Sequence, residues 1–222
     1  MPVSVWAILA AAGRGDRLGL DRPKAFAPLK ERPLIAESLE RLDASDWIEG
    51  IVVAAPPEWE EPCILVAEEV AAGKVAETVT GGETRGDSVR NALAQVPEEA
   101  AVVLVHDAAR PLVTEEVIGR VVTALEEGWD GAVPILPVSD TVKRVEGEVV
   151  TETIDRAGLV IVQTPQAFVA GIFRRAVESG GEASDCSALV EAAGGRVRAV
   201  PGDPRLLKIT EPADLELVES WL

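Results

Sequence analysis

The chain has 222 residues, 47% of them hydrophobic, and so can bury a full core as a single domain. Its formal net charge of −17 argues against nucleic acid or an anionic membrane surface as a partner, because the long-range field repels polyanions. The apolar runs are far shorter than a membrane span and the N-terminus lacks the basic flank of a signal peptide, so we expect a soluble, cytoplasmic protein.

Short apolar strands alternate with amphipathic segments over the first part of the chain. The pattern predicts strands at Val3–Leu9, Ile51–Ala55, Val75–Val79 and Ala101–Val105, helices near Leu34–Leu42, Ser88–Val96 and Glu115–Glu127, and a further segment after Pro57. Strands that are apolar on both faces are typical of parallel sheets covered by helices. We therefore expect an α/β fold with a Rossmann-like, mostly parallel sheet and helices on both faces.

From Gly131 the pattern changes to β-branched runs. Val142–Val145 and Val149–Ile154 flank Glu146-Gly147-Glu148, which predicts a protruding β-hairpin arm at about residues 137–157. Such an arm exposes apolar residues unless a partner subunit covers them or the hairpin folds onto its own domain. Further along, the pattern predicts helices near Phe173–Glu178 and Ser187–Ala193, a strand near Val197–Val200, and a last helix from Pro212 with Thr210 as its N-cap.

The first strand runs into a glycine-rich loop, Gly13-Arg14-Gly15-Asp16-Arg17-Leu18-Gly19, followed by Pro23-Lys24. Glycines let backbone N–H groups approach an anion closely, which suits a phosphate. The dinucleotide fingerprint would need glycine where Leu18 stands, and Pro23 delays any following helix. Arg17 and Lys24 would then supply the positive charge. An ordinary strand-to-helix loop is the alternative.

Three later segments carry further candidates. Gly81-Gly82 through Ser88 follows a strand and precedes a helix, so it forms either a cup for a base or phosphate, or a plain turn with an N-cap. Asp107 stands at a strand tip, where it reaches a sugar hydroxyl or Mg²⁺, or caps its own loop. Lys208 lies inside a predicted apolar strand, Leu206–Thr210, and either extends to solvent or clamps a phosphate.

The chain offers no evident nucleophile or general base. Its single histidine, His106, is interpreted as a satisfied core residue or as a residue that supports a site residue without touching the ligand itself. Cys63 and Cys186 are interpreted as buried or idle thiols, since neither belongs to a Cys-x-x-Cys motif. One histidine also excludes a histidine-rich metal site.

Seven motifs occur in order along the chain, and two of them together, V-H-D-A-A-R-P and D-T-V-K, are far more specific than the glycine loop alone. The seven are A-A-G-x-G-x-R with P-K, GG-x-x-R-x-x-S, V-H-D-A-A-R-P, D-T-V-K, D-R-x-G-L, T-P-Q and K-I-T-x-P-x-D-L, from Ala10 to Asp214. In these the chain resembles the 2-C-methyl-D-erythritol 4-phosphate cytidylyltransferases. The resemblance implies transfer of CMP from CTP to 2-C-methyl-D-erythritol 4-phosphate, with release of pyrophosphate, by a single nucleotidyltransferase-type domain spanning residues 1–222.

The resemblance also implies site residues. Arg17 and Lys24 would hold the triphosphate, and the segment containing Ala11, Ala12, Gly13 and Gly15 would surround the cytidine together with Gly82 and Ser88. Asp107, Ala108 and Arg110 would face the ribose, the metal or the acceptor. Lys208 would position the acceptor phosphate, with Thr141, Arg156 and Thr164 completing its pocket. Arg17, Lys24, Arg156 and Lys208 are the expected catalytic residues, Mg²⁺ the cofactor with Asp107 as its protein ligand, and a homodimer through the arm the assembly.

The chain departs from the family pattern at Ser184-Asp185-Cys186-Ser187, where T-D-[DE]-x-S-x-L is usual. Three rival functions remain open at this point. They are a nucleotidyltransferase with a sugar phosphate or pterin phosphate acceptor, a nucleotide-binding regulator without turnover, and a nicotinamide oxidoreductase.

Overall fold

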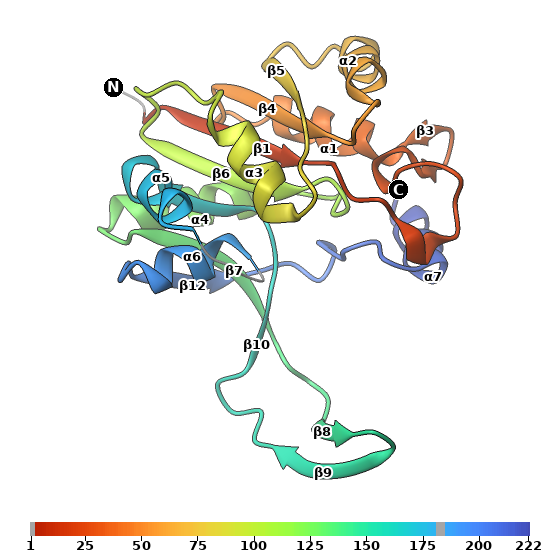
Figure 1. Ribbon diagram of the computed structural model, residues 1–222, viewed down its shortest axis with the longest axis vertical. Coiled ribbons are helices and arrows are strands. Elements are labelled where there is room, and N and C mark those ends of the chain that lie inside the picture. Colours follow the sequence, from red (N-terminus) through yellow and green to blue (C-terminus); the bar gives the residue numbers. More distant parts are fainter. Residues whose placement is uncertain (1–2, 181–184) are drawn as a thin grey trace.

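An eight-stranded sheet forms the centre of the molecule, as the computed structural model of residues 3–180 and 185–222 shows (Figure 1). Its strands are β1 (Val5–Ala10), β4 (Gly50–Ala55), β5 (Val75–Thr80), β6 (Val102–Asp107), β7 (Gly131–Pro137), β10 (Val160–Val162), β11 (Gln166–Val169) and β12 (Val197–Pro201). The order is β10-β7-β11-β6-β1-β4-β5, with β12 beside β7. The four strands β5, β4, β1 and β6 are parallel neighbours, whereas β11 runs antiparallel to β6 and β7.

Helices cover both faces of the sheet. In β1, Ala7 and Leu9 belong to one buried cluster and Ile8 to another, as expected because successive side chains point to opposite faces. The first cluster includes residues of α1 (Leu34–Asp43), α2 (Glu60–Glu69) and α4 (Glu115–Glu126). The second includes residues of α3 (Arg85–Leu93), α5 (Ala170–Glu178) and α6 (Cys186–Ala192). The predicted α/β fold is therefore confirmed, with a sheet that is mixed but mostly parallel.

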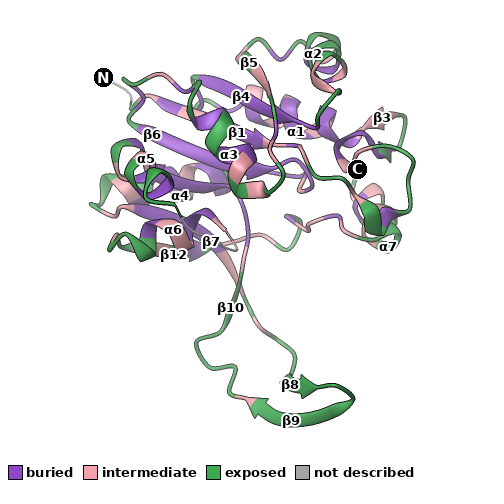
Figure 2. Ribbon diagram, in the orientation of Figure 1, coloured by how far each residue is buried: buried purple, intermediate pink, exposed green. Residues whose placement is uncertain are grey.

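The predicted hairpin is confirmed as an arm that projects from the body (Figure 1). It consists of β8 (Val142–Glu146) and β9 (Val149–Ile154), which form a two-stranded sheet of their own within the described part of the chain. Val145, Val149 and Val150 are 54%, 64% and 58% exposed, and Figure 2 shows the arm as exposed throughout most of its length. The hairpin therefore does not fold onto its own domain.

Some predicted boundaries and elements were wrong. The third helix begins at Arg85 rather than Ser88, because Thr84 caps it and forms a capping box with Asp87. The last helix, α7 (Pro212–Glu219), is capped by Glu211, not Thr210, whose backbone N–H instead donates to Asp214. The predicted strand Leu206–Thr210 is an irregular segment anchored by the Ile209 N–H, which donates to Ala109 O.

The remaining elements are short. They are the 3₁₀ turns η1 (Asp16–Leu18) and η2 (Lys24–Phe26) and the two-residue strands β2 (Pro28–Leu29) and β3 (Arg32–Pro33). No helix among residues 3–180 and 185–222 is long and apolar enough to cross a membrane.

The first loop folds back on itself at Gly15, bringing Lys24 beside the glycines. The Lys24 N–H donates to Gly13 O over 3.2 Å, and Gly15 has φ +79°. A Cβ at Gly15 would lie 2.9 Å from Lys24 Cβ and 3.1 Å from its backbone. Both the dihedral angle and the close approach therefore require glycine at this position.

Gly15→Ala is expected to disturb the loop more than Gly19→Ala does. Gly19 also has a positive φ, +66°, but a Cβ there meets nothing within 4 Å. The left-handed conformation alone costs an L-residue about 1–2 kcal/mol, and Gly19→Ala is expected to lose that much free energy of unfolding. Gly15→Ala is expected to lose more, because its Cβ would also collide with Lys24. Denaturant unfolding of both variants measures the difference; equal losses of stability would contradict the close approach.

Candidate active site

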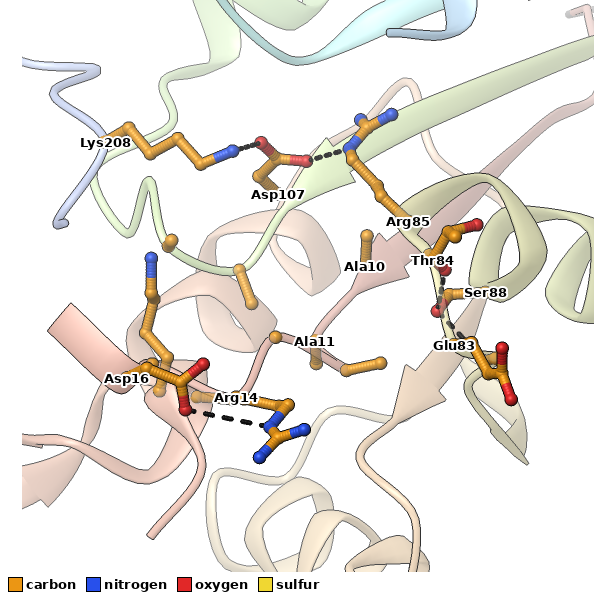
Figure 3. Close-up of a pocket in the computed structure, with 18 of the residues that line it drawn as sticks. Ala10, Ala11, Arg14, Asp16, Glu83, Thr84, Arg85, Ser88, Asp107 and Lys208 are labelled. Carbon is orange, nitrogen blue, oxygen red and sulfur yellow. Dashed lines mark hydrogen bonds and ion pairs between the residues drawn. The ribbon is translucent and has the colours of Figure 1, made fainter. Parts of the chain in front are cut away.

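A cavity of about 440 Å³ opens at the carboxyl ends of β1 and β6 (Figure 3). The first loop, which follows β1, meets Lys208 there and the Gly82 loop, which is residues 81–84 between β5 and α3. The cavity brings together eleven of the predicted site residues: Ala11, Ala12, Gly13, Gly15, Arg17, Lys24, Gly82, Ser88, Asp107, Ala108 and Lys208. This is the edge of a parallel sheet at which functional loops gather.

A second cavity of about 430 Å³ shares Arg85, Asp107 and Lys208 with the first. It adds Arg110 and Thr164 from the predicted set. The two cavities therefore meet at the Asp107 carboxylate.

Two predicted residues, Thr141 and Arg156, line neither cavity. Both are exposed residues of the arm region, and the Arg156 guanidinium donates to Ser139 O within the same arm. In the segment that departs from the family pattern, Ser184 lies outside the described residues. Asp185 caps α6 by accepting the Ala188 N–H, and Asp185 and Ser187 line the second cavity.

Asp107 is held between two cations from distant parts of the chain. Oδ1 accepts from Arg85 Nε over 2.8 Å and Oδ2 from Lys208 Nζ over 2.7 Å (Figure 3). The Asp107 side chain is only 9% exposed. Burial alone would raise the pKa of Asp107, but Arg85 and Lys208 outweigh it and hold that pKa well below its ordinary value. The carboxylate is ionised at neutral pH.

Arg85 is the site residue that the sequence interpretation missed. It is the first residue of α3, so the capping of that helix by Thr84 sets its position. Besides Asp107, it donates from Nη1 to Cys186 Sγ over 3.2 Å. The pKa of the Cys186 thiol is raised, and burial is the main cause. The signal was present in the motif GG-x-x-R-x-x-S, but no spacing rule indicated that this arginine faces Asp107.

Lys24 stands in a cluster of positive charge. Its Nζ donates to Ile209 O over 3.1 Å. Burial lowers the pKa of Lys24, and the nearby charges of Lys208 and Arg17 lower it further. Since like charges held together repel, a polyanion bound in this cavity would relieve that repulsion. The arrangement is suited to phosphate.

The Gly82 loop packs tightly against the first loop. The Ser88 hydroxyl donates to Thr84 O over 2.9 Å and accepts the Gly82 N–H over 3.0 Å, so it fixes the loop to α3. A Cβ at Gly81 would lie 2.3 Å from Ala12 Cβ. Glycine at this position therefore allows a close approach of the two loops, which line the cavity through Ala12 and Gly82.

His106 is fully buried and its ring is hydrogen-bonded on both sides, which confirms its interpretation as a satisfied core residue. Its Nε2 lies 3.0 Å from Arg110 O and its Nδ1 3.1 Å from Thr164 Oγ1. Burial lowers the pKa of His106 to about 4. The Arg110 guanidinium donates to Leu206 O over 2.6 Å and more weakly to Val162 O.

Among the described residues no group of three or more His, Cys, Asp or Glu side chains forms a metal-binding cluster. The buried carboxylate of the cavity is Asp107, accompanied at the surface by Asp16 and Glu83. Magnesium ions in nucleotide sites are usually bound by one or two carboxylates and the substrate phosphates. The donor set fits an ion that arrives with a nucleotide and does not fit an all-protein cage.

The chain matches the family model of IspD, 2-C-methyl-D-erythritol 4-phosphate cytidylyltransferase, over residues 5–222. It is 45% identical to the 2-C-methyl-D-erythritol 4-phosphate cytidylyltransferase of Nocardia farcinica, covering 99% of this chain and 94% of that protein, and 42% identical to that of Rubrobacter xylanophilus, covering 97% and 94%. Its structure resembles the crystal structure of the Thermus thermophilus enzyme of that name, with a TM-score of 0.79, 35% identity and coverage of 100% and 98%. The chain therefore belongs to the IspD family and is a nucleotidyltransferase of the non-mevalonate isoprenoid pathway.

Proposed function

We propose that this chain transfers CMP from CTP to 2-C-methyl-D-erythritol 4-phosphate and releases pyrophosphate, with the reaction taking place where the two cavities meet. The observation that carries the proposal is the convergence of Arg17, Lys24 and Lys208 on a glycine-rich cavity. The two hydroxyl groups among the described residues that line it are already engaged, because Thr84 donates to the Asp87 carboxylate and Ser88 to Thr84 O. A transfer in which the acceptor itself brings the nucleophile needs only such a cavity.

The acceptor phosphate is ionised near neutral pH, so no general base is required. One of its oxygens forms a bond to the α-phosphorus of CTP as the bond between that phosphorus and the bridging oxygen of pyrophosphate breaks. Catalysis then depends on in-line placement and on neutralising the charge of the phosphoryl groups. Arg17 and Lys24, on the same loop as the glycines, are the groups we assign to that task.

The two ends of the reaction are assigned to different walls. We assign the cytidine to the glycine-rich side of the first cavity, where backbone groups would recognise the base. The residues of that side are Ala11, Ala12, Gly13, Gly15, Gly82 and Ser88. Lys208 holds the acceptor phosphate, and Arg110 and Thr164 lie beside it in the second cavity. Asp107 lines both cavities, and Ala108 lines the first beside it.

Magnesium is proposed as the cofactor, held by the phosphates of CTP together with Asp107. When bound, it neutralises phosphate charge and orients the triphosphate. Each Asp107 oxygen already accepts from one cation, and a carboxylate oxygen has a second lone pair for a further ligand.

A homodimer formed through the arm is proposed as the working assembly, with Thr141 and Arg156 serving the partner's acceptor site. Two observations support it. The arm exposes Val145, Val149 and Val150, and it holds both predicted acceptor residues away from the cavities of its own chain. The single-domain organisation and the cytoplasmic location stay predictions.

The function is tested by measuring pyrophosphate release from CTP and Mg²⁺, with the acceptor present or omitted and with ATP and GTP as alternative donors. Release that requires both CTP and 2-C-methyl-D-erythritol 4-phosphate is expected. Release with another donor or acceptor would indicate a different transferase, and CTP binding without release would indicate a regulator.

Lys24→Ala is expected to fold normally and to lower kcat by about 10² to 10³-fold or more, because a preorganised charge is lost where charge develops. The same pyrophosphate assay measures it. Lys30→Ala is the control, since Lys30 is an exposed lysine of the same region outside both cavities. Near wild-type turnover by Lys24→Ala would refute the role of Lys24.

Arg156→Ala is expected to raise the KM for the acceptor more than the KM for CTP, because its proposed partner is the acceptor phosphate. Steady-state kinetics with each substrate varied in turn measures the split. Arg144→Ala, which breaks an exposed ion pair with Glu152 on the same arm, is the matched control. Equal effects of Arg156→Ala on both KM values would contradict the assignment.

Val149→Asp is expected to convert a dimer to a monomer and to reduce activity in parallel, because it places a charge on the apolar surface of the arm. Sedimentation equilibrium gives the molar mass. Ile64→Asp changes a residue on α2 that is 44% exposed, and it controls for added charge elsewhere. An unchanged dimer, or a wild-type monomer with full activity, argues against the arm as the interface.

A further inference from the structure

His106 lines neither cavity, yet its ring connects the two ends of the turn that carries Asp107 and Arg110. The ring accepts or donates at both nitrogens: Nε2 at 3.0 Å from Arg110 O and Nδ1 at 3.1 Å from Thr164 Oγ1. The Asp107 N–H also donates to Thr164 Oγ1, over 3.1 Å. These three hydrogen bonds form a continuous chain from the backbone of Asp107 to the backbone of Arg110.

The direction of each hydrogen bond follows from elementary chemistry. A backbone carbonyl has no proton to give, so Nε2 must carry the hydrogen that Arg110 O accepts. A fully buried ring without a carboxylate partner among the described residues is neutral, which leaves Nδ1 as an acceptor. Thr164 must then donate its hydroxyl proton to Nδ1 while its oxygen accepts the Asp107 N–H.

The turn that His106 connects has a hydrogen bond at every carbonyl, two of them from distant parts of the chain. Asp107 O accepts the Arg110 N–H, Ala108 O accepts the Ser38 hydroxyl, Ala109 O accepts the Ile209 N–H, and Arg110 O accepts from His106. The donor of the last bond, the His106 ring, is also hydrogen-bonded to Thr164, which lines the second cavity.

We infer that His106 is a positioning residue of the transfer reaction, acting as a neutral Nε2–H imidazole that fixes the Asp107–Arg110 turn and the direction of the Thr164 hydroxyl. The inference rests on the proposed function for its catalytic consequence. Because the Thr164 proton is donated to His106, that hydroxyl can only accept a hydrogen bond from a ligand. It therefore suits a hydroxyl group of the acceptor and not a phosphate oxygen.

The tautomer is tested without any assay of activity. Since the chain contains one histidine, two-dimensional ¹H–¹⁵N NMR of untagged, histidine-labelled protein yields the signals of a single ring. A protonated Nε2 and an unprotonated Nδ1 are expected, with the Nδ1 shift moving in Thr164→Val and retained in Thr164→Ser. A protonated Nδ1, or a ring that is insensitive to Thr164→Val, overturns the inference.

Kinetics tests the positioning role. His106→Leu removes both hydrogen bonds and is expected to lower kcat about tenfold to a hundredfold, the range for a displaced catalytic group, with a much smaller change in the KM for CTP. His106→Gln places an amide N–H near the Nε2 position and is expected to recover most of that loss. Thr164→Val is expected to lower kcat similarly, and the double variant to be no slower than the slower single variant, because both residues act through one chain of bonds.

Three results would overturn the role. They are an unchanged kcat per folded molecule in His106→Leu despite a lower melting temperature, no recovery in His106→Gln, and fully multiplicative losses in the double variant. A wild-type chain that transfers no CMP would instead remove the proposed function, while the NMR signals still decide the hydrogen-bond chain.

Discussion

The site is organised around one negative charge held away from water. Asp107 ends a buried strand, and its side chain keeps that charge only because Arg85 and Lys208 each donate to one of its oxygens. The partners come from the start of α3 and from the segment before α7, so the ion pairs also bring three distant parts of the chain to one point. Removing one partner of a buried charge leaves the other uncompensated, which makes such a triad sensitive to any change in its members. The same carboxylate separates the cavity assigned to the nucleotide from the cavity assigned to the acceptor.

Much of the fold could be predicted because its pattern is local. The strands β1, β4 and β6 are apolar on both faces and lie between amphipathic helices, and the hairpin has β-branched runs around a glycine. The strands β7, β10 and β11 gave weaker signals, since β7 contains Pro134 and Pro137 and β10 has only three residues. Leu206–Thr210 is apolar enough to suggest a strand, but among residues 3–180 and 185–222 it pairs with no strand, and its buried residues Leu206 and Ile209 belong to two different core clusters.

The candidate site was predicted to a similar degree and for a similar reason. Loops that follow parallel strands meet at one edge, so Gly13, Gly82 and Asp107 could be expected to lie together. The ion-pair partner of each charged residue could not be predicted in the same way, because it depends on how the helices and loops pack against one another in three dimensions. Arg85 is the example: its type and position were visible, but only the tertiary contact with Asp107 gives it a role. The roles predicted for Thr141 and Arg156 of the arm are a different case, because the acceptor site proposed for them belongs to a second copy of the chain.

The assembly proposed for the arm has a consequence for how the protein behaves at different concentrations. An acceptor site completed by another chain exists only in the assembled state, so the fraction of working sites follows mass action rather than the amount of folded protein alone. On dilution such an enzyme loses specific activity while each chain remains folded, because the sheet and its two buried clusters lie within one chain. Turnover per chain would then vary with expression level, and the exposed valines of the arm would set the concentration at which the change occurs.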